Sequence, residues 1–316
     1  MKKYTVYVAS AAEDGGIYKY ELSSEGKLTE IASIPLHRPY YFVKKGNLLH
    51  TILRAPTVFE GNGGYLEVDC DLKTSGDLYT TAGSCPCHLE VAEGNAYVTN
   101  YLSGSITKIG SAPLVHESTE HNHPGRQDSP HIHFVKETPD GKYLAVCDLG
   151  LDKIFVYDKD LNFVSDVSVP DGAGVRHLVF SNDGKYAYTA NELDTTTSVL
   201  AYENGVFTLL DTVAVNPEVE NYPAAIRLSP SGDTLYVSQR GMDGISIFDV
   251  DGGRVSLRGF ASSHGEWPRD FAVSPDGKFI ICTNEHGNNV TVLDVENSYA
   301  MTDNVDLEIP LCVLIV

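Results

Sequence analysis

Long apolar stretches are missing from this sequence, which has no segment near the roughly 18 consecutive apolar residues of a membrane-spanning helix. It also lacks the Gly-x-Ser-x-Gly elbow that presents the nucleophile of many serine hydrolases, so covalent catalysis by serine is not predicted. Basic residues are few: 23 Lys and Arg stand against 43 Asp and Glu, and the formal net charge is −20. A surface of that sign repels nucleic acid and anionic membranes, so we expect neither as a partner.

Cysteine pairs are scarce too. Cys85 and Cys87 are the only close pair among six cysteines, and no second pair completes a zinc site. The chain begins with Lys2 and Lys3, but the segment after them reaches Glu13 too soon to hold the apolar core of a secretion signal. We therefore expect a cytosolic protein with reduced cysteines, without a metal or other cofactor, that is a monomer or a weak homo-oligomer.

Glycine and proline, in contrast, are plentiful. The 28 Gly and 15 Pro are scattered among short runs of Val, Ile, Tyr and Thr, which favours strands and tight turns and predicts an all-β fold. Four segments share a turn followed by a strand, and their turn glycines are 43, 48 and 45 residues apart. These glycines are Gly141, Gly184, Gly232 and Gly277. Weaker copies at Gly46 and Gly94 continue the series toward the N-terminus, and residues 4–8 make a seventh strand of this kind.

Each of these strands is followed by another of alternating character, and there are seven of those as well. They are expected at residues 17–20, 65–68, 106–109, 154–157, 199–202, 245–248 and 290–293. A period of about 40 to 50 residues with several strands per repeat indicates a β-propeller, because one small sheet cannot bury both faces until neighbouring blades cover them. We predict a single seven-bladed β-propeller domain over residues 1–316, with four antiparallel strands in each blade.

The two ends of the chain are predicted to complete one blade together. The first repeat begins in the middle of the motif and lacks its innermost strand, whereas residues 310–316 resemble the strand entries of the other blades. The C-terminal strand is therefore expected to join the N-terminal blade and close the ring.

Charged residues are predicted to gather at one mouth of the central channel. In a four-stranded antiparallel blade, the loop entering the first strand and the loop after the second lie on the same face. Positions eight residues before the turn glycines should surround the central axis; they are His133, Arg176, Ala224 and Arg269. Loops after the second strands add Glu192 and Arg240. Several of the nine arginines thus share one rim of an acidic protein, which predicts an anion site unless these groups only hydrogen-bond strand ends.

Several spaced motifs run through the chain. They are Cys85–His88, Asn100–Ser105, Arg126–His133, Asp148–Asp152, Arg176–His177, Asn191–Leu193, Arg240–Gly241 and Pro268–Phe271. In this order they resemble the lactonase family of seven-bladed propellers, which includes bacterial propeller-type 6-phosphogluconolactonases and fungal carboxymuconate lactonizing enzymes. The resemblance implies functional roles for His131 or His133, Arg176, Glu192 and Arg240. The chain departs from the family pattern at Val175, where proline is common, and at Gln239, where asparagine is usual.

The resemblance also implies a substrate and a set of residues that bind it. Further substrate-binding residues are expected to be His88, Asn100, Arg126, Asp148, His177, Asn191, Arg269 and Asp270. The implied reaction is hydrolysis of a small anionic sugar lactone, 6-phosphogluconolactone in the oxidative pentose phosphate route. Two alternatives stay open: a lactonase or lactonizing enzyme for another sugar lactone or a carboxymuconolactone, and a non-catalytic propeller that binds a partner through its rim.

The chemistry of lactone hydrolysis suggests how the charged residues divide the work. We expect Glu192 or a channel histidine to take a proton from water, and Arg176 with a partner histidine to stabilise the oxyanion. Arg240 and Arg269 would clamp a phosphate or carboxylate of the substrate. Histidines 116, 121, 123, 131 and 133 could suggest a metal, but their irregular spacing favours a polar loop over the channel mouth.

Overall fold

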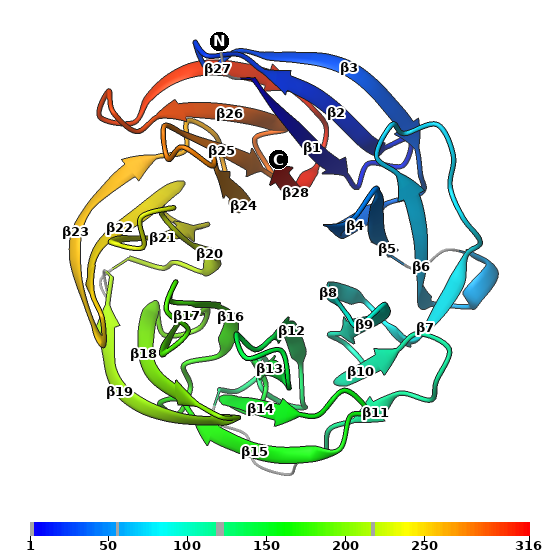
Figure 1. Ribbon diagram of the computed structural model, residues 1–316, viewed down its shortest axis with the longest axis vertical. Helices are drawn as coiled ribbons and strands as arrows, with labels where there is room; N and C mark the ends of the chain where they lie inside the picture. The colour runs from blue at the N-terminus through cyan, green and yellow to red at the C-terminus, as the bar shows by residue number, and fades with distance from the viewer. Residues whose placement is uncertain (1–2, 55–56, 118–122, 216–218) are drawn as a thin grey trace.

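The computed structural model describes residues 3–54, 57–117, 123–215 and 219–316. Its strands form seven four-stranded antiparallel sheets around a central channel (Figure 1), which confirms the predicted all-β seven-bladed propeller. The 3-10 turn η1 (Thr57–Phe59) is the only helical element of the described residues. Within the same ranges, no helix has the length and apolar character needed to cross a membrane.

The blades follow one another around the ring in chain order. From the innermost to the outermost strand, they are blade 1, β28 (Pro310–Ile315), β1 (Tyr4–Ser10), β2 (Gly16–Leu22) and β3 (Leu28–Pro35); blade 2, β4 (Pro39–Lys45), β5 (Leu48–Leu53), β6 (Asn62–Asp69) and β7 (Tyr79–Ser84); blade 3, β8 (Pro86–Ala92), β9 (Asn95–Asn100), β10 (Ser105–Lys108) and β11 (Leu114–Val115); blade 4, β12 (Ile132–Glu137), β13 (Leu144–Asp148), β14 (Lys153–Tyr157) and β15 (Phe163–Ser168); blade 5, β16 (Val175–Phe180), β17 (Tyr186–Asn191), β18 (Thr196–Glu203) and β19 (Val206–Ala214); blade 6, β20 (Pro223–Leu228), β21 (Thr234–Gln239), β22 (Gly244–Asp251) and β23 (Arg254–Ser262); and blade 7, β24 (Pro268–Val273), β25 (Phe279–Asn284), β26 (Asn289–Asp294) and β27 (Ala300–Asp306).

The repeated turn between the first two strands of a blade depends on its glycine. Gly141 has a φ of 71°, in the left-handed region that side chains with a Cβ rarely adopt. The aspartate before it fixes the turn, because Asp140 accepts hydrogen bonds from the Thr138 hydroxyl at 2.6 Å and from the Lys142 N–H at 3.2 Å. The sequence period is therefore the period of this turn.

The ring closes as predicted, with the C-terminal strand in the N-terminal blade. β28 pairs antiparallel with β1, from Val6 opposite Ile315 to Ser10 opposite Pro310. A residue of the preceding blade anchors the added strand, since Asp270 accepts a hydrogen bond from the Val313 N–H at 3.2 Å. The first and last strands thus share one sheet.

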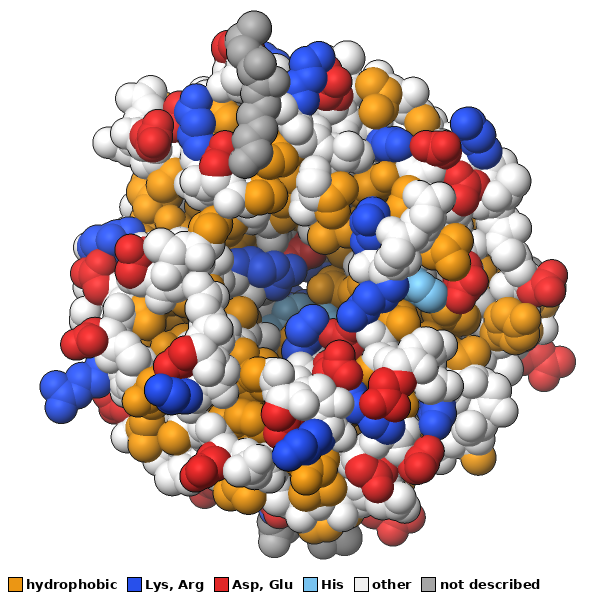
Figure 2. All heavy atoms as spheres, in the orientation of Figure 1, with side chains coloured by type: hydrophobic (Ala, Val, Ile, Leu, Met, Phe, Trp, Pro, Cys, Tyr) orange, Lys and Arg blue, Asp and Glu red, His pale blue; other side chains and the backbone are white. Residues whose placement is uncertain are grey.

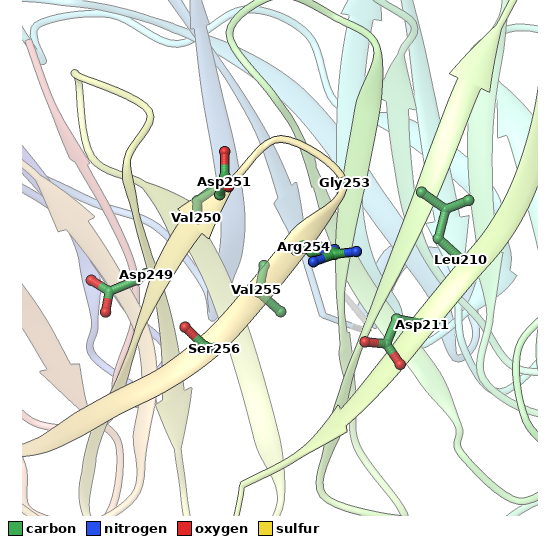
Figure 3. Close-up of a pocket in the computed structure, with 9 residues that line it drawn as sticks. All are labelled: Leu210, Asp211, Asp249, Val250, Asp251, Gly253, Arg254, Val255 and Ser256. Atoms are coloured by element: carbon green, nitrogen blue, oxygen red, sulfur yellow. The ribbon is translucent and has the colours of Figure 1, made fainter.

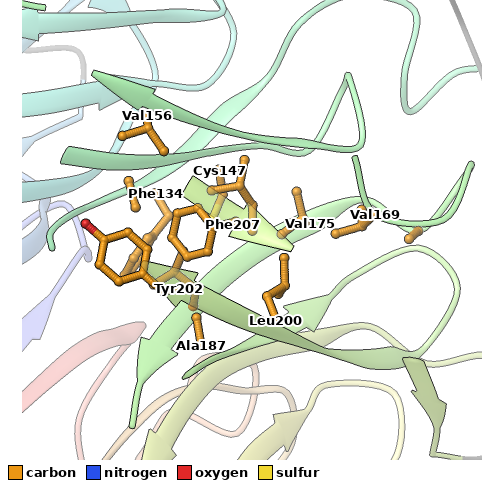
Figure 4. Close-up of a cluster of buried hydrophobic side chains, with 13 residues drawn as sticks. Phe134, Cys147, Val156, Val169, Val175, Ala187, Leu200, Tyr202 and Phe207 are labelled. Atoms are coloured by element: carbon orange, nitrogen blue, oxygen red, sulfur yellow. The ribbon is translucent and has the colours of Figure 1, made fainter. Parts of the chain in front are cut away.

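The hydrophobic core is divided among the gaps between blades. Seven clusters of buried apolar residues occur in the described chain, and each is built mainly from two adjacent blades. Figure 4 shows the cluster between blades 4 and 5, where Phe134 and Val156 of one sheet face Leu200, Tyr202 and Phe207 of the other. Each sheet is therefore buried on both faces only by its neighbours, which is the physical basis of the repeat.

The innermost strands share an irregularity that shapes the channel mouth. In all seven, the pairing register with the second strand shifts just after the first residue or two. A β-bulge inserts an extra residue and re-aims its side chain. The extra residues, which we call the bulge ring, are Tyr40, Cys87, His133, Arg176, Ala224, Arg269 and Leu311.

Candidate active site

A second set of equivalent positions lies next to the bulge ring. In every blade, the residue just after the second strand donates its backbone N–H to a carbonyl in the loop that enters the first strand. This bond places one side chain per blade at the same channel mouth. We call these residues the strand-end ring; they are Ala11, Arg54, Tyr101, Leu149, Glu192, Arg240 and Glu285.

The two rings enclose a cavity of about 240 Å³ at the channel mouth. This volume lies below the usual range for pockets that hold drug-sized ligands and suits a small metabolite. Figure 2 shows Lys and Arg side chains gathered around the central hollow, with histidine visible inside it. The cavity is lined by Tyr40, Arg54, Cys85, Cys87, Tyr101, Arg126, His133, Glu192, Arg240 and Arg269.

Three arginines share a single carboxylate at one end of the cavity. Glu192 Oε2 lies 3.0 Å from Arg176 Nε and 2.7 Å from Arg240 Nη2, while Oε1 accepts a hydrogen bond from Arg126. The Arg176 Nη1 also donates to the carbonyl of Ala224 at 2.8 Å. The side chains of Glu192, Arg176 and Arg240 are at most 7% exposed, so water screens this cluster little.

The cluster sets the charge state of its members. Burial alone would raise the pKa of Glu192, but the charges of Arg240, Arg176 and Arg126 outweigh burial and lower that pKa to about 2. Burial and the neighbouring Arg240 lower the pKa of Arg176 to about 10, so Arg176 stays charged at neutral pH. At neutral pH, Glu192 is an ionised group fully engaged with arginines and is poorly suited to accept a proton.

His133 stands beside this cluster in a different state. Burial, together with the charges of Arg176 and Arg269, holds the pKa of His133 well below its usual value, so the imidazole is neutral at pH 7. Its Nδ1 is buried and has no hydrogen-bond partner among the described residues. His133 lines the cavity, whereas the ring of His131 stacks on Tyr101 at 4.4 Å and does not line it. Of the two histidines left open by the sequence, His133 is therefore the one in contact with the cavity.

The opposite end of the cavity holds an ion pair and an aromatic ring. Arg269 Nη1 lies 2.9 Å from Glu285 Oε2, and its Nη2 donates to the hydroxyl of Tyr40. The guanidinium carbons of Arg54 and Arg269 lie 5.2 and 5.1 Å from the centroid of the Tyr40 ring. Tyr40 and Arg54 were not among the site residues predicted from the sequence.

Several residues predicted to bind substrate lie outside the cavity lining. Asp148 accepts hydrogen bonds from the N–H groups of His131, Gly150 and Leu151, and Asp270 pairs with Arg227 at 2.7 Å. The amides of Asn100 and Asn191 donate to serine and threonine hydroxyls of their own blades. His88 and His177 are buried deeper in the channel, 5.3 Å apart between ring centroids. These six side chains support the cavity from behind, while Arg126 and Arg269 line it.

The histidine-rich segment contains no metal site within the described residues, where no group of three or more His, Cys, Asp or Glu side chains could hold an ion. His116 lies 2.6 Å from Asp148 Oδ2 and 2.7 Å from the hydroxyl of Tyr157, so both of its ring nitrogens have partners. His123 is exposed, and His121 lies outside the described residues. The segment also supplies Arg126 to the cavity, which agrees with its interpretation as a polar loop at the channel mouth.

A larger pocket, of about 800 Å³, lies far from the channel mouth, between the outer strands β19 and β23 (Figure 3). Asp211, Asp249 and Asp251 line it, together with Arg254. Three carboxylates against one guanidinium repel an anionic ligand. The smaller, arginine-rich cavity is therefore the better candidate for an anion site.

The fold and the rings agree with comparisons to known proteins. The family model described as lactonase, 7-bladed beta-propeller matches residues 5–315. An uncharacterised protein of Staphylococcus aureus strain N315 is 31% identical over 300 residues, which cover 88% of each chain. A solved structure from Lactobacillus plantarum is 29% identical, with a TM-score of 0.89 and full coverage of both chains.

Two further solved structures carry functional descriptions. A candidate 6-phosphogluconolactonase from Bacteroides fragilis is 27% identical, with a TM-score of 0.88 over 99% of this chain and 98% of that one. The periplasmic gluconolactonase of Pseudomonas aeruginosa is 25% identical, with a TM-score of 0.88 over 100% of this chain and 99% of that one.

Proposed function

The chain belongs to the lactonase family of seven-bladed β-propellers, and we propose that it hydrolyses a sugar lactone, 6-phosphogluconolactone, to 6-phosphogluconate. The observation that carries the proposal is the neutral His133 beside three arginines anchored on Glu192. Hydrolysis of an ester needs a proton acceptor for water and positive charge where the carbonyl oxygen becomes an oxyanion. Both requirements are met within one small cavity.

In the proposed reaction, the water oxygen bonds to the lactone carbonyl carbon while His133 accepts a proton from that water. The carbonyl oxygen becomes an oxyanion, which Arg176 and Arg240 stabilise by charge and hydrogen bonding. The intermediate then expels the ring oxygen, which takes the proton back from the His133 imidazolium. Glu192 acts as a positioning residue, because it holds the guanidiniums in place before the reaction begins.

The second candidate substrate is an unphosphorylated sugar lactone. It is favoured by the similarity to the gluconolactonase of Pseudomonas aeruginosa. Both substrates fit the same hydrolytic steps, so a comparison of their rates separates the two candidates. The excess of arginines over carboxylates in the cavity lining favours the phosphorylated lactone.

The direct test is the rate of lactone hydrolysis by the purified protein, with fresh 6-phosphogluconolactone and gluconolactone, corrected for spontaneous hydrolysis. We expect catalysis of both, with the phosphorylated lactone preferred. We also expect Arg176→Ala to lower kcat by about 10²- to 10³-fold, because it removes a charge aimed at the oxyanion. A wild-type protein that leaves both spontaneous rates unchanged would sink the proposal, as would an Arg176→Ala variant as active as wild type.

The acid side of the pH profile is a further expectation. A base must be unprotonated to accept a proton, and burial holds the pKa of His133 well below the ordinary value of 6.5. We therefore expect kcat/KM to remain flat as the pH falls from about 8 to about 6, and to decline only below that range. A half-maximal rate near the ordinary histidine pKa would contradict this environment for His133.

A further inference from the structure

Arg54 is held in the cavity wall in the same way as Glu192 and Arg240. It follows β5 directly, and its N–H donates to the carbonyl of Arg38 at 3.1 Å. The corresponding bonds are 2.8 Å for Glu192 and 3.3 Å for Arg240. The backbone of Arg54 is therefore fixed at a position where other blades place their charged cavity residues.

The charge of Arg54 differs from that of the other cavity arginines in having no carboxylate partner. Arg126, Arg176 and Arg240 share Glu192, and Arg269 pairs with Glu285. Among the described residues, the Arg54 side chain makes no hydrogen bond or ion pair, and its contact is with the face of Tyr40. Five guanidiniums and two carboxylates thus surround the cavity, and the uncompensated donors include those of Arg54.

The surroundings of Arg54 suit a doubly charged ligand group. Tyr40 is 7% exposed, and its hydroxyl is fixed by Arg269, so the ring is a rigid support for both guanidiniums. Two cations held near one ring attract an anion that can contact both of them. A phosphate monoester carries about two negative charges at neutral pH and accepts bidentate hydrogen bonds from guanidinium groups.

Arg54 also lies across the channel from the groups assigned to the reaction. It belongs to blade 2, whereas Arg176 and Arg240 belong to blades 5 and 6, on the far side of the ring (Figure 1). In a phosphorylated sugar lactone, the phosphate and the reacting carbonyl are at different ends of the molecule. A site with the reaction at one end and a free guanidinium at the other matches that separation.

We propose that Arg54, supported by Tyr40, binds the phosphate of the lactone and so sets the preference for a phosphorylated over an unphosphorylated substrate. This inference rests on the proposed function, and it concerns the choice of substrate rather than the hydrolytic step. Arg54 differs in this from Arg176, whose contact would form with the reacting atoms. The consequence is a change in KM, with kcat largely retained.

The test compares wild type with Arg54→Gln and Arg54→Lys on 6-phosphogluconolactone and gluconolactone. We expect Arg54→Gln to reduce the preference for the phosphorylated lactone in kcat/KM by about 10- to 100-fold, mainly through KM. Arg54→Lys should restore part of the preference, because it keeps the charge without the planar fork. The matched control is Arg254→Gln on β23, an exposed arginine of the outer pocket, which should leave the preference as in wild type.

A binding measurement keeps the two proposals distinguishable. By titration calorimetry, wild type should bind 6-phosphogluconate more tightly than gluconate, and Arg54→Gln should lose that difference. A wild type without lactonase activity would overturn the proposed function, yet loss of the binding difference in Arg54→Gln would still support a phosphate site. If Arg54→Gln keeps the wild-type difference in both binding and kcat/KM, the assignment of Arg54 is wrong.

Discussion

The His133→Gln variant is expected to hydrolyse the lactone about 10²- to 10⁴-fold more slowly than wild type in kcat, with a small change in KM. Glutamine is uncharged and polar like the neutral imidazole, but it cannot accept a proton from water. The loss falls on kcat because proton transfer occurs only as the reaction proceeds. The measurement is steady-state hydrolysis of the preferred lactone, corrected for the spontaneous rate.

This prediction depends on which group in the cavity can accept a proton. Glu192 cannot do so readily, because Arg126, Arg176 and Arg240 hold its pKa at about 2 and occupy its oxygens. His133 remains, since it is neutral and its Nδ1 has no partner among the described residues. Its environment resembles that of an amine whose charged form is opposed by neighbouring cations.

His177 provides a matched control for His133→Gln. It is also buried, its ring centroid lies 5.2 Å from that of His133, and its pKa is likewise held well below the ordinary value by burial and Arg176. It does not line the main cavity, so His177→Gln should reduce kcat much less than His133→Gln. Equal losses in the two variants would indicate a packing effect, and an unchanged kcat in His133→Gln would exclude His133 as the base.

The fold could be predicted from sequence because its period is written in local turn chemistry. Each strong repeat needs a glycine at positive φ, as at Gly141, and an aspartate that caps the turn, as at Asp140. Counting these turns gives the blades, and the missing inner strand of the first repeat gives the closure. No long-range information is needed for either step.

The bulge ring was found only where the hairpin length is constant. His133, Arg176 and Arg269 lie eight residues before their turn glycines, as the count assumes. Cys87 and Tyr40 occupy equivalent positions, but their hairpins are shorter by one and two residues, so the same count passes over them. A register shift of this size is visible only in the strand pairing.

The strand-end ring shows a second reason for incomplete prediction. In blades 3, 5, 6 and 7, the residue before the ring position is Asn or Gln, which marks the loop as polar. Arg54 instead follows Leu53, so its loop gives no such signal. The polar markers themselves, such as Asn100 and Asn191, are hydrogen-bonded within their blades, and sequence cannot separate such supporting groups from those that face the cavity.

Deletion of residues 310–316 is expected to abolish cooperative folding. The deletion removes the whole innermost strand of blade 1 and leaves β1 with an unpaired edge facing the channel. It also removes Leu311, Cys312 and Val313, which are each at most 4% exposed. Burial of a large apolar side chain stabilises by about 1.5 to 3 kcal/mol, and the strand's backbone bonds add to that, so the loss approaches a typical total stability of about 5 to 15 kcal/mol.

The damage extends beyond blade 1, because the strand is bound on both sides of the closure. Asp270 of blade 7 accepts the Val313 N–H, and Leu311 packs in the cluster between blades 2 and 3. Without β28, blades 7 and 2 lose their common neighbour, and the ring opens at one seam. The measurement is thermal and urea unfolding followed by circular dichroism, with expected loss of the single sharp transition seen for wild type.

A circular permutant separates the role of the strand from the role of its place in the chain. The N–H of Thr5 donates to the carbonyl of Val316 at 2.9 Å, so the two ends are adjacent and a short glycine linker can join them. New ends can be opened at the turn containing Gly184, where Asp183 and Gly184 lie between β16 and β17. This permutant keeps β28 beside β1 as a covalent hairpin, and we expect it to unfold in one cooperative transition, unlike the truncated chain. Because the two proteins differ in whether β28 is present, a truncated chain that melts like wild type would show that the ring does not depend on this strand for closure.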